Sequence, residues 1–319
     1  ALDLGKLEIA THRSNLVSNE TIHKAGMMAA GKPEVSVLQD YESPWMDDEL
    51  RAFRDTAARF VEKEMLPHDA RWRAQHHVDR EVWRLAGATG LLLLDVPTEY
   101  GGGGGDFRHE CVLYQELARR ALSGFGQGVH SICAHYVLNY GTEAHKQRWL
   151  PRMASGDLIG AIAMTEPGAG SDLQGIRTRA VREGDHYVIN GSKIFITNGG
   201  SADLLMLVVR TNPDDRKKGL SILMVETQGL EGYRVGRVLD KMGMPAQDTA
   251  ELFFENVRVP ADCLLGGEEG RGMYQMMGDL PYERATIAVC GVAAMEGAVA
   301  ETARYIKERK AFGKAIGEF

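Results

Sequence analysis

The sequence predicts an α+β protein of several domains: a helical N-terminal domain, an antiparallel β middle domain and part of a C-terminal helical bundle. Apolar residues recur at helical spacing from Trp45 to about Leu150, strand-like alternation follows Gly156, and a helical pattern returns from about Gly270. At 319 residues the chain exceeds one average domain. We divide it into an N-terminal arm (1–40), a helical domain (41–157), a β-barrel-like domain (158–268) and the start of a helical bundle (269–319).

Composition narrows the function classes. The formal net charge of −7 gives no general attraction to nucleic acid or to anionic membranes. The four cysteines are far apart and form no CxxC pair, so we expect reduced, mostly buried thiols and no metal site. No uninterrupted apolar run reaches the roughly 20 residues that span a bilayer. Residues 1–40 lack an apolar signal core and carry acids, against a transit peptide. We therefore expect a soluble protein in a cytosol-like compartment.

The first helix is the best defined element of the helical region. The segment "MDDELRAFRDTAARFVEKEML" places one set of apolar residues on one face: Leu50, Phe53, Ala57, Phe60, Val61 and Met65. Asp47 is the expected N-cap. The segments "ECVLYQELARRAL" and "HSICAHYVLNYG" continue the helical pattern.

The β region begins with the clearest turn signal in the chain. In "HYVINGSKIFIT" the alternation surrounds Asn190-Gly191, which predicts a hairpin at that pair. Further strands are expected at "DLLMLVVRT", "LSILMVE", "YRVGRVL" and "AELFFENVRV". Together they indicate an antiparallel domain of ordinary size.

Two glycine-rich stretches resemble nucleotide-binding loops. The run "GGGGGD" at 101–106 lacks the strand-turn-helix context of such loops, so we interpret it as a flexible loop. The stretch "TEPGAGSD" at 165–172 follows an apolar strand but leads into more β structure. By spacing alone it is an ordinary surface turn, although Gly168 and Gly170 would let a large ligand approach the backbone closely.

Glu283 opens the last helical segment, "LPYER", and two interpretations of it stay open from the residues alone. Counted helically, it shares a face with Ile287 and Cys290, and no basic residue follows three or four positions later. That pattern suits a carboxylate placed in an apolar site. A solvated first-turn acid, favoured by the helix dipole, fits equally well. Pro281 marks either the start of the helix or a kink.

Several motifs taken together resemble the acyl-CoA dehydrogenase family. They occur in the family's order over about 45–319: "PTEYGG", "GTEAHKQRWLP", "AMTEPGAGSD", "YVINGSKIFITNGG", "MGMPAQDTAELFFENVRVP" and "ERKAFGK". The "L-x-x-E-R" segment is similar to that of long-chain and isovaleryl dehydrogenases. The resemblance implies bound FAD and a homotetramer built as a pair of dimers. Because the family pattern continues past Phe319, we expect the chain to be C-terminally incomplete, with family features for FAD retention, the oxyanion site and tetramer assembly in the missing part.

The resemblance also implies site residues. Ile162, Met164 and Thr165 would lie along the flavin, with Phe195 packed on it and Thr197 near its N5 atom. Ser171 would contact both the FAD diphosphate and the acyl-CoA. Arg309 and Phe312 would reach the FAD of a neighbouring subunit. Tyr282 and Arg284 would bind substrate, and Glu283 would remove the α proton. Without the family, Thr165 would be a strand-end hydroxyl, Phe195 a core residue and Arg309 a solvated helix end.

The implied reaction is α,β-dehydrogenation of an acyl-CoA thioester to the trans-2-enoyl-CoA, with electrons passed to an electron-transfer flavoprotein. Burial would raise the pKa of Glu283 and make it a better base. The alternatives are an oxidase or monooxygenase of the same fold, or a noncatalytic flavin- or DNA-binding module. The acidic charge balance speaks against DNA. We expect a bacterial-type cytoplasmic enzyme, with the mitochondrial matrix as the alternative.

Overall fold

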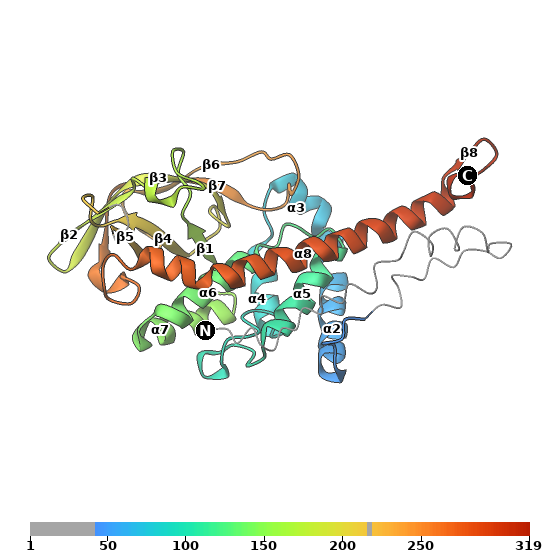
Figure 1. Ribbon diagram of the computed structural model, residues 1–319, viewed down its shortest axis with the longest axis horizontal. Coiled ribbons are helices and arrows are strands. Elements are labelled where there is room, and N and C mark those ends of the chain that lie inside the picture. Colours follow the sequence, from blue (N-terminus) through green and yellow to red (C-terminus); the bar gives the residue numbers. More distant parts are fainter. Residues whose placement is uncertain (1–41, 216–218) are drawn as a thin grey trace. The chain divides into compact units, whose positions relative to one another are not determined.

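The structure, a computed structural model, describes residues 42–215 and 219–319 (Figure 1). The predicted arm at 1–40 lies outside these residues. The first half of the described chain is helical, as predicted. Its α-helices are α2 (Asp48–Phe60), α3 (Asp69–Gln75), α4 (Arg80–Ala88), α5 (Phe107–Arg119), α6 (Gln127–Tyr140) and α7 (Glu143–Ala154).

The start of α2 is capped as its sequence predicts. The Leu50 N–H donates to Asp47 Oδ1 at 2.9 Å, which satisfies one of the main-chain donors left free at a helix N-terminus. The helix buries Leu50, Ala57 and Phe60 on the predicted face and continues through a π-helical turn, Val61–Met65.

The glycine run is a loop, but its predicted flexibility is wrong. Main-chain N–H groups of Gly103, Gly104 and Gly105 donate to carbonyls of the segment 93–96. A Cβ added at Gly102 would lie 2.2 Å from the Val96 carbonyl oxygen, so the two backbones meet too closely for a side chain. The run therefore packs the chain tightly before Asp106 caps α5.

The middle of the chain forms one seven-stranded sheet. Its path is β1-β4-β2-β3-β7-β6, with β5 beside β4. The strands are β1 (Gly160–Ala163), β2 (Arg179–Glu183), β3 (His186–Thr197), β4 (Leu204–Arg210), β5 (Leu220–Glu226), β6 (Tyr233–Val238) and β7 (Thr249–Pro260). Most pairs are antiparallel, as predicted. The parallel pairings of β4 with β1 and with β2 were not expected.

The predicted hairpin at Asn190-Gly191 is wrong. Residues His186 to Thr197 form one continuous strand, and its hairpin partner β2 joins it through Gly184 instead. Asn190-Gly191 lies at a register shift between β3 and β7. A Cβ at Gly191 would meet Thr178 Oγ1 at 2.5 Å, so close packing, rather than a reversing turn, explains the glycine.

The core lies on both faces of the sheet. Along β4 every residue from Leu204 to Val209 is buried, and alternate side chains enter two different clusters. One cluster joins the sheet to the helical region through α6, which packs against β1 and β4. The other cluster covers the opposite face. This arrangement fixes the end of β1 beside the helices.

The last long element is helix α8, Gly272–Glu308, which packs along α5 and α6 (Figure 1). It continues through Pro281, so the proline does not start the helix. By length and composition alone α8 could span a membrane, a property that some helices of soluble proteins share. In its second half Val292, Met295 and Val299 are about half exposed or more. Beyond α8 lies a small hairpin of β8 (Lys310–Ala311) and β9 (Lys314–Ala315).

Candidate functional site

Two segments that are distant in sequence meet at the end of β1. The Ile194 N–H donates to the Thr165 carbonyl at 2.9 Å, which joins the residues after β1 to the end of β3. Ile162, Met164 and Thr165 are partly exposed there, as is Thr197. The structure thus brings four of the predicted cofactor contacts to one partly open edge.

Phe195 has an unusual backbone conformation at this edge. Its φ is 61° and its side chain is 62% exposed. An aromatic residue is rarely found in the left-handed region, and such strain persists only where the surroundings impose it. The β3–β7 register shifts between Lys193 and Ile196, and this irregularity turns Phe195 outward. An exposed, strained aromatic beside a polar edge suits a residue that packs on a flat ligand.

A buried ion pair supports this edge, and sequence reasoning missed it. Lys193 Nζ lies 2.9 Å from both Glu166 Oε1 and the Met164 carbonyl oxygen, and the lysine side chain is fully buried. Burial lowers the pKa of Lys193 to about 8, although Glu166 opposes the shift. Glu166 also accepts hydrogen bonds from the Arg177 and Thr178 N–H groups. The sequence does contain one signal for this ion pair: a lysine at a position of the alternating strand where an apolar residue is expected.

The loop after this edge is open. Ser171 is exposed, and a Cβ added at Gly168 or Gly170 would meet no atom within 4 Å in the described chain. The loop therefore has room on its outer side for a ligand. Its base is fixed, because Glu166 and Ala169 exchange main-chain hydrogen bonds.

Glu283 lies between α8 and α6, with Tyr136 as its partner. The Tyr136 hydroxyl donates to Glu283 Oε1 at 2.8 Å. Burial raises the pKa of Glu283, the Tyr136 hydrogen bond opposes this, and the charge of Asp279 adds to it. The predicted apolar face contributes less than expected, since Ile287 is 70% exposed. Packing against α6 buries the carboxyl group instead.

The two neighbours of Glu283 point in different directions. Tyr282 is buried, stacks on His135 with ring centroids 4.0 Å apart and contacts Phe107 edge-on. Little of the Tyr282 surface is therefore available for the predicted contact with substrate. Arg284 is exposed. Successive helical residues are about 100° apart, which explains why the three side chains diverge.

A second acidic group near Tyr282 was also missed. Glu110 is fully buried and accepts hydrogen bonds from the Leu94 N–H, Ser131 Oγ and Gln127 Nε2. Burial raises its pKa to about 7, and the charge of Asp95 adds to the shift. The apolar periodicity of the sequence does not identify such a residue, because a glutamate on a helix is normally interpreted as a surface charge.

Arg309 and Phe312 lie apart from the other predicted contacts within this chain. Arg309 is the C-cap of α8, 26 residues after Glu283, which corresponds to about 39 Å along a helix. Phe312 is 95% exposed. Within this chain both residues therefore lie far along the helix from Glu283.

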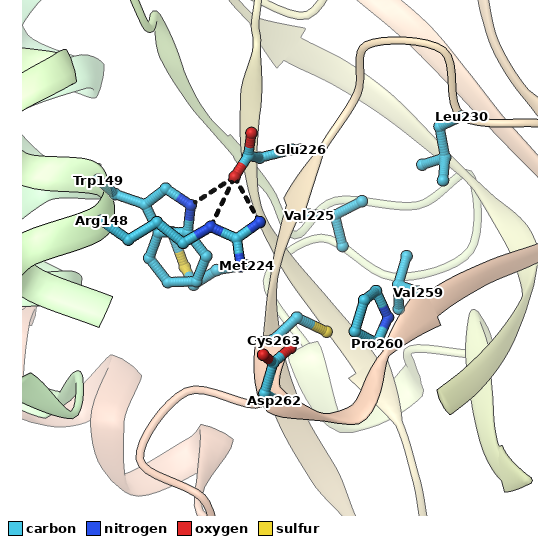
Figure 2. A pocket seen from close by; sticks show the side chains of 10 residues that line it. All are labelled: Arg148, Trp149, Met224, Val225, Glu226, Leu230, Val259, Pro260, Asp262 and Cys263. Carbon is cyan, nitrogen blue, oxygen red and sulfur yellow. Dashed lines mark hydrogen bonds and ion pairs between the residues drawn. The ribbon is translucent and has the colours of Figure 1, made fainter. Parts of the chain in front are cut away.

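One pocket lies between α7, β5 and the end of β7 (Figure 2). Glu226 at its rim accepts hydrogen bonds from Arg148 and Trp149, so its charge is already satisfied. None of the predicted site residues lines this pocket. Among the described residues no group of three or more His, Cys, Asp or Glu side chains could hold a metal ion, and all four cysteines are free.

Three family models match the chain in order. They are the acyl-CoA dehydrogenase N-terminal domain over 47–157, the middle domain over 161–257 and the C-terminal domain over 270–319. The chain is 48% identical over 267 residues to the mitochondrial long-chain specific acyl-CoA dehydrogenase of Mus musculus. This match covers 83% of the chain but 62% of that protein, less than two thirds of its length.

Solved structures agree with the family models. An acyl-CoA dehydrogenase from Geobacillus kaustophilus is 43% identical with a TM-score of 0.84, covering 87% of this chain and 73% of that one. A glutaryl-CoA dehydrogenase from Mycobacterium smegmatis, solved in complex with FADH2, is 29% identical with a TM-score of 0.78, covering 86% and 69%. Because both sequence and fold agree from the first helices to α8, the chain belongs to the acyl-CoA dehydrogenase family.

Proposed function

We propose that this chain is an FAD-dependent acyl-CoA dehydrogenase in which Glu283 removes the α proton of the acyl thioester. The observation that carries the proposal is the position of Glu283: a half-buried carboxyl group, bonded to Tyr136, whose pKa is raised by burial. A base with a raised pKa is better matched to a weakly acidic C–H group. No other carboxylate in "L-x-x-E-R" context is present in the sequence.

The proposed reaction removes two hydrogens from the acyl chain, one as a proton and one as a hydride. The Cα–H bond breaks and its proton goes to a Glu283 carboxylate oxygen, while the β carbon loses a hydride, and a Cα–Cβ double bond forms. Bound FAD supplies the acceptor for that hydride. Glu283 then holds the proton, and burial against α6 limits the competing access of water.

The partly open edge at the end of β1 fits a flavin. Ile162, Met164 and Thr165 offer main-chain groups and a hydroxyl along one side, and Thr197 offers a second hydroxyl. The outward Phe195 would cover a ring face. Ser171 would contact the diphosphate and the acyl-CoA, and Arg284 would contact substrate. The FADH2 in the related glutaryl-CoA dehydrogenase supports this assignment.

The position of Arg309 supports a proposal about assembly. Since it is far from Glu283 along α8, we propose that Arg309 and Phe312 complete the FAD site of a neighbouring subunit in a homotetramer. We further propose an electron-transfer flavoprotein as the acceptor. The relatives named above come from a mitochondrion and from a bacterium, so they support either the mitochondrial matrix or the proposed bacterial cytoplasm.

The test is Glu283→Gln in the full-length, FAD-loaded protein. The amide keeps the size and removes the basicity, so anaerobic bleaching of the flavin by acyl-CoA should slow by roughly 10²- to 10⁴-fold. Glu301→Gln, an exposed change on the same helix, should leave the rate unchanged. A Glu283→Gln rate close to the parental rate would exclude Glu283 as the base. A ladder of acyl-CoA chain lengths would identify the substrate, and rapid reoxidation by oxygen would favour an oxidase.

A further inference from the structure

Helices α6 and α8 pack against each other beside Glu283. The Tyr140 side chain of α6 reaches the backbone of α8, since a Cβ added at Gly278 would lie 2.2 Å from its hydroxyl oxygen. This packing places the second half of α6 against the turn of α8 that contains Glu283. Two side chains there contact or face the carboxyl group, and the proposed reaction uses neither of them.

The first is Tyr136 of α6. Its side chain has no exposed surface, and its hydroxyl donates to Glu283 Oε1 at 2.8 Å. Burial, with the charge of Glu283, raises the pKa of Tyr136 far above its usual range. The hydroxyl therefore remains a donor at every working pH. A buried donor of this kind restricts the carboxylate to one orientation and stabilises its ionised form.

The second is Asp279, four residues before Glu283 and on the same helical face. Asn139 Nδ2 donates to Asp279 Oδ1 at 2.8 Å, while Oδ2 is buried without a hydrogen-bond partner among the described residues. Burial raises the pKa of Asp279, and Asn139 and His135 oppose the shift. A negative charge one turn away disfavours ionisation of Glu283, which makes its carboxylate more basic.

We propose that Tyr136 and Asp279 are positioning residues for Glu283 that act in opposite senses, the tyrosine by fixing and stabilising the carboxylate and the aspartate by increasing its basicity. The inference rests on the proposed role of Glu283. The remaining polar groups around it are accounted for: His135 and Asn139 of α6 act on Asp279, Tyr140 lies beside Tyr136, and Arg284 is exposed.

The test compares pH profiles of flavin reduction in the full-length protein. The base acts when deprotonated, so the rate rises with pH through the pKa of Glu283. Tyr136→Phe removes a stabiliser of the carboxylate, so the acid limb should move to higher pH, and the limiting rate should fall on the order of tenfold because the base is less well placed. Asp279→Asn removes the neighbouring charge, so the acid limb should move to lower pH. The KM for acyl-CoA should change little in either variant.

A second readout does not depend on activity. The protonated carboxyl band of Glu283, assigned by infrared difference against Glu283→Gln, can be titrated in each variant. Its midpoint should rise in Tyr136→Phe and fall in Asp279→Asn. If Glu283→Gln leaves the rate unchanged while these midpoints move as stated, the proposed base is wrong but the coupling of the three residues is right. The two failures are thereby separated.

Matched controls exclude nonspecific effects. Tyr114→Phe also removes a buried hydroxyl, one that is not bonded to Glu283, and Asp157→Asn removes an exposed carboxylate; neither should move the profile. Fluorotyrosine at position 136 keeps the ring and strengthens the donor, so it should shift the limb to lower pH even if Tyr136→Phe folds poorly. Lower rates in both variants without opposite displacements of the limb and of the infrared midpoint would overturn the proposal.

Discussion

Lys193 Nζ lies 2.9 Å from Glu166 Oε1, with the lysine side chain fully buried and the glutamate nearly so. The same ammonium group donates to the Met164 carbonyl, and the glutamate accepts two main-chain N–H groups. The pair therefore connects β3 to the chain just after β1. Because that connection holds the edge where we place the flavin, its loss should affect both stability and cofactor binding.

Removing one member of this pair should destabilise the protein. Lys193→Met leaves Glu166 buried without its cation, which costs about 3 to 5 kcal/mol. The free energy of unfolding in urea should fall accordingly, and FAD affinity should fall with it. Removing both charges in Lys193→Met with Glu166→Gln should recover part of the loss. For comparison, Arg304→Ala at the exposed pair with Glu301 should change stability by about 0.5 kcal/mol or less. An equal effect at the two pairs would contradict the prediction.

His130 should make stability depend on pH. Its Nδ1 accepts from the Gly160 N–H at 3.0 Å and its Nε2 lies 3.1 Å from the Met153 carbonyl, so the neutral ring fits and a second proton would face a donor. Burial lowers its pKa to about 4 from 6.5. Between these values the unfolded state binds more protons, so stability falls as pH decreases from 6.5 to 4, by about 3 kcal/mol.

The measurement for His130 is urea unfolding across that range. His130→Gln should be less stable at neutral pH but should show a flatter profile between pH 6.5 and 4. A slope identical to the parental slope would mean that other groups cause the acid sensitivity.

Arg309→Ala should weaken FAD binding in the assembled full-length protein. If Arg309 contacts the diphosphate of a neighbouring subunit, removal of a charge-assisted hydrogen bond costs about 1.5 to 3 kcal/mol, or roughly 10- to 150-fold in the dissociation constant. The control is Arg304→Ala on the same helix. The Arg304 side chain is already paired with Glu301 and Glu308, so its removal should not change FAD affinity. An unchanged constant in Arg309→Ala would assign that residue to the solvated surface.

Phe195→Asn should separate stability from cofactor binding. Asparagine tolerates the left-handed backbone at φ 61° better than phenylalanine does, and the exposed ring contributes little to the core. The protein without cofactor should therefore gain about 0.5 to 1 kcal/mol of stability. FAD binding should weaken, because the ring that packs on the flavin is lost. Thermal unfolding with and without FAD measures both effects, and a change of the same sign in the two would refute the assignment.

The sequence predicted those parts of the fold that depend on local chemistry. The Asp47 cap, the apolar face of α2 and the strands from β4 to β7 follow from capping and periodicity, and the structure has them. The hairpin at Asn190-Gly191 failed because that dipeptide suits any position needing an unusual φ or close backbone contact. Here Thr178, which directly precedes the neighbouring strand β2, creates the contact, and no local pattern contains it.

The site residues were predicted from family motifs. The buried polar residues that hold them in place were missed, and one physical reason explains this. Tyr136, Asp279, Glu166 and Lys193 matter through partners that are distant in the chain: Glu166 and Lys193 are 27 residues apart, Asn139 and Asp279 are 140 apart, and Tyr136 and Glu283 are 147 apart. A buried polar residue has no periodic signature, since it occupies the same positions as an apolar one. Only the packing of α6 on α8 and of β3 on β1 reveals these partners.

Pro281 gives the turn before Glu283 a property that the rest of α8 lacks. A proline has no N–H, so the carbonyl of Met277, four residues earlier, loses its usual i+4 helical donor. Bending at this point breaks no main-chain hydrogen bond between these two residues. The first two turns of α8 and the segment beginning at Glu283 are therefore joined by a softer region, where a change of axis direction requires less work than anywhere in a fully bonded helix.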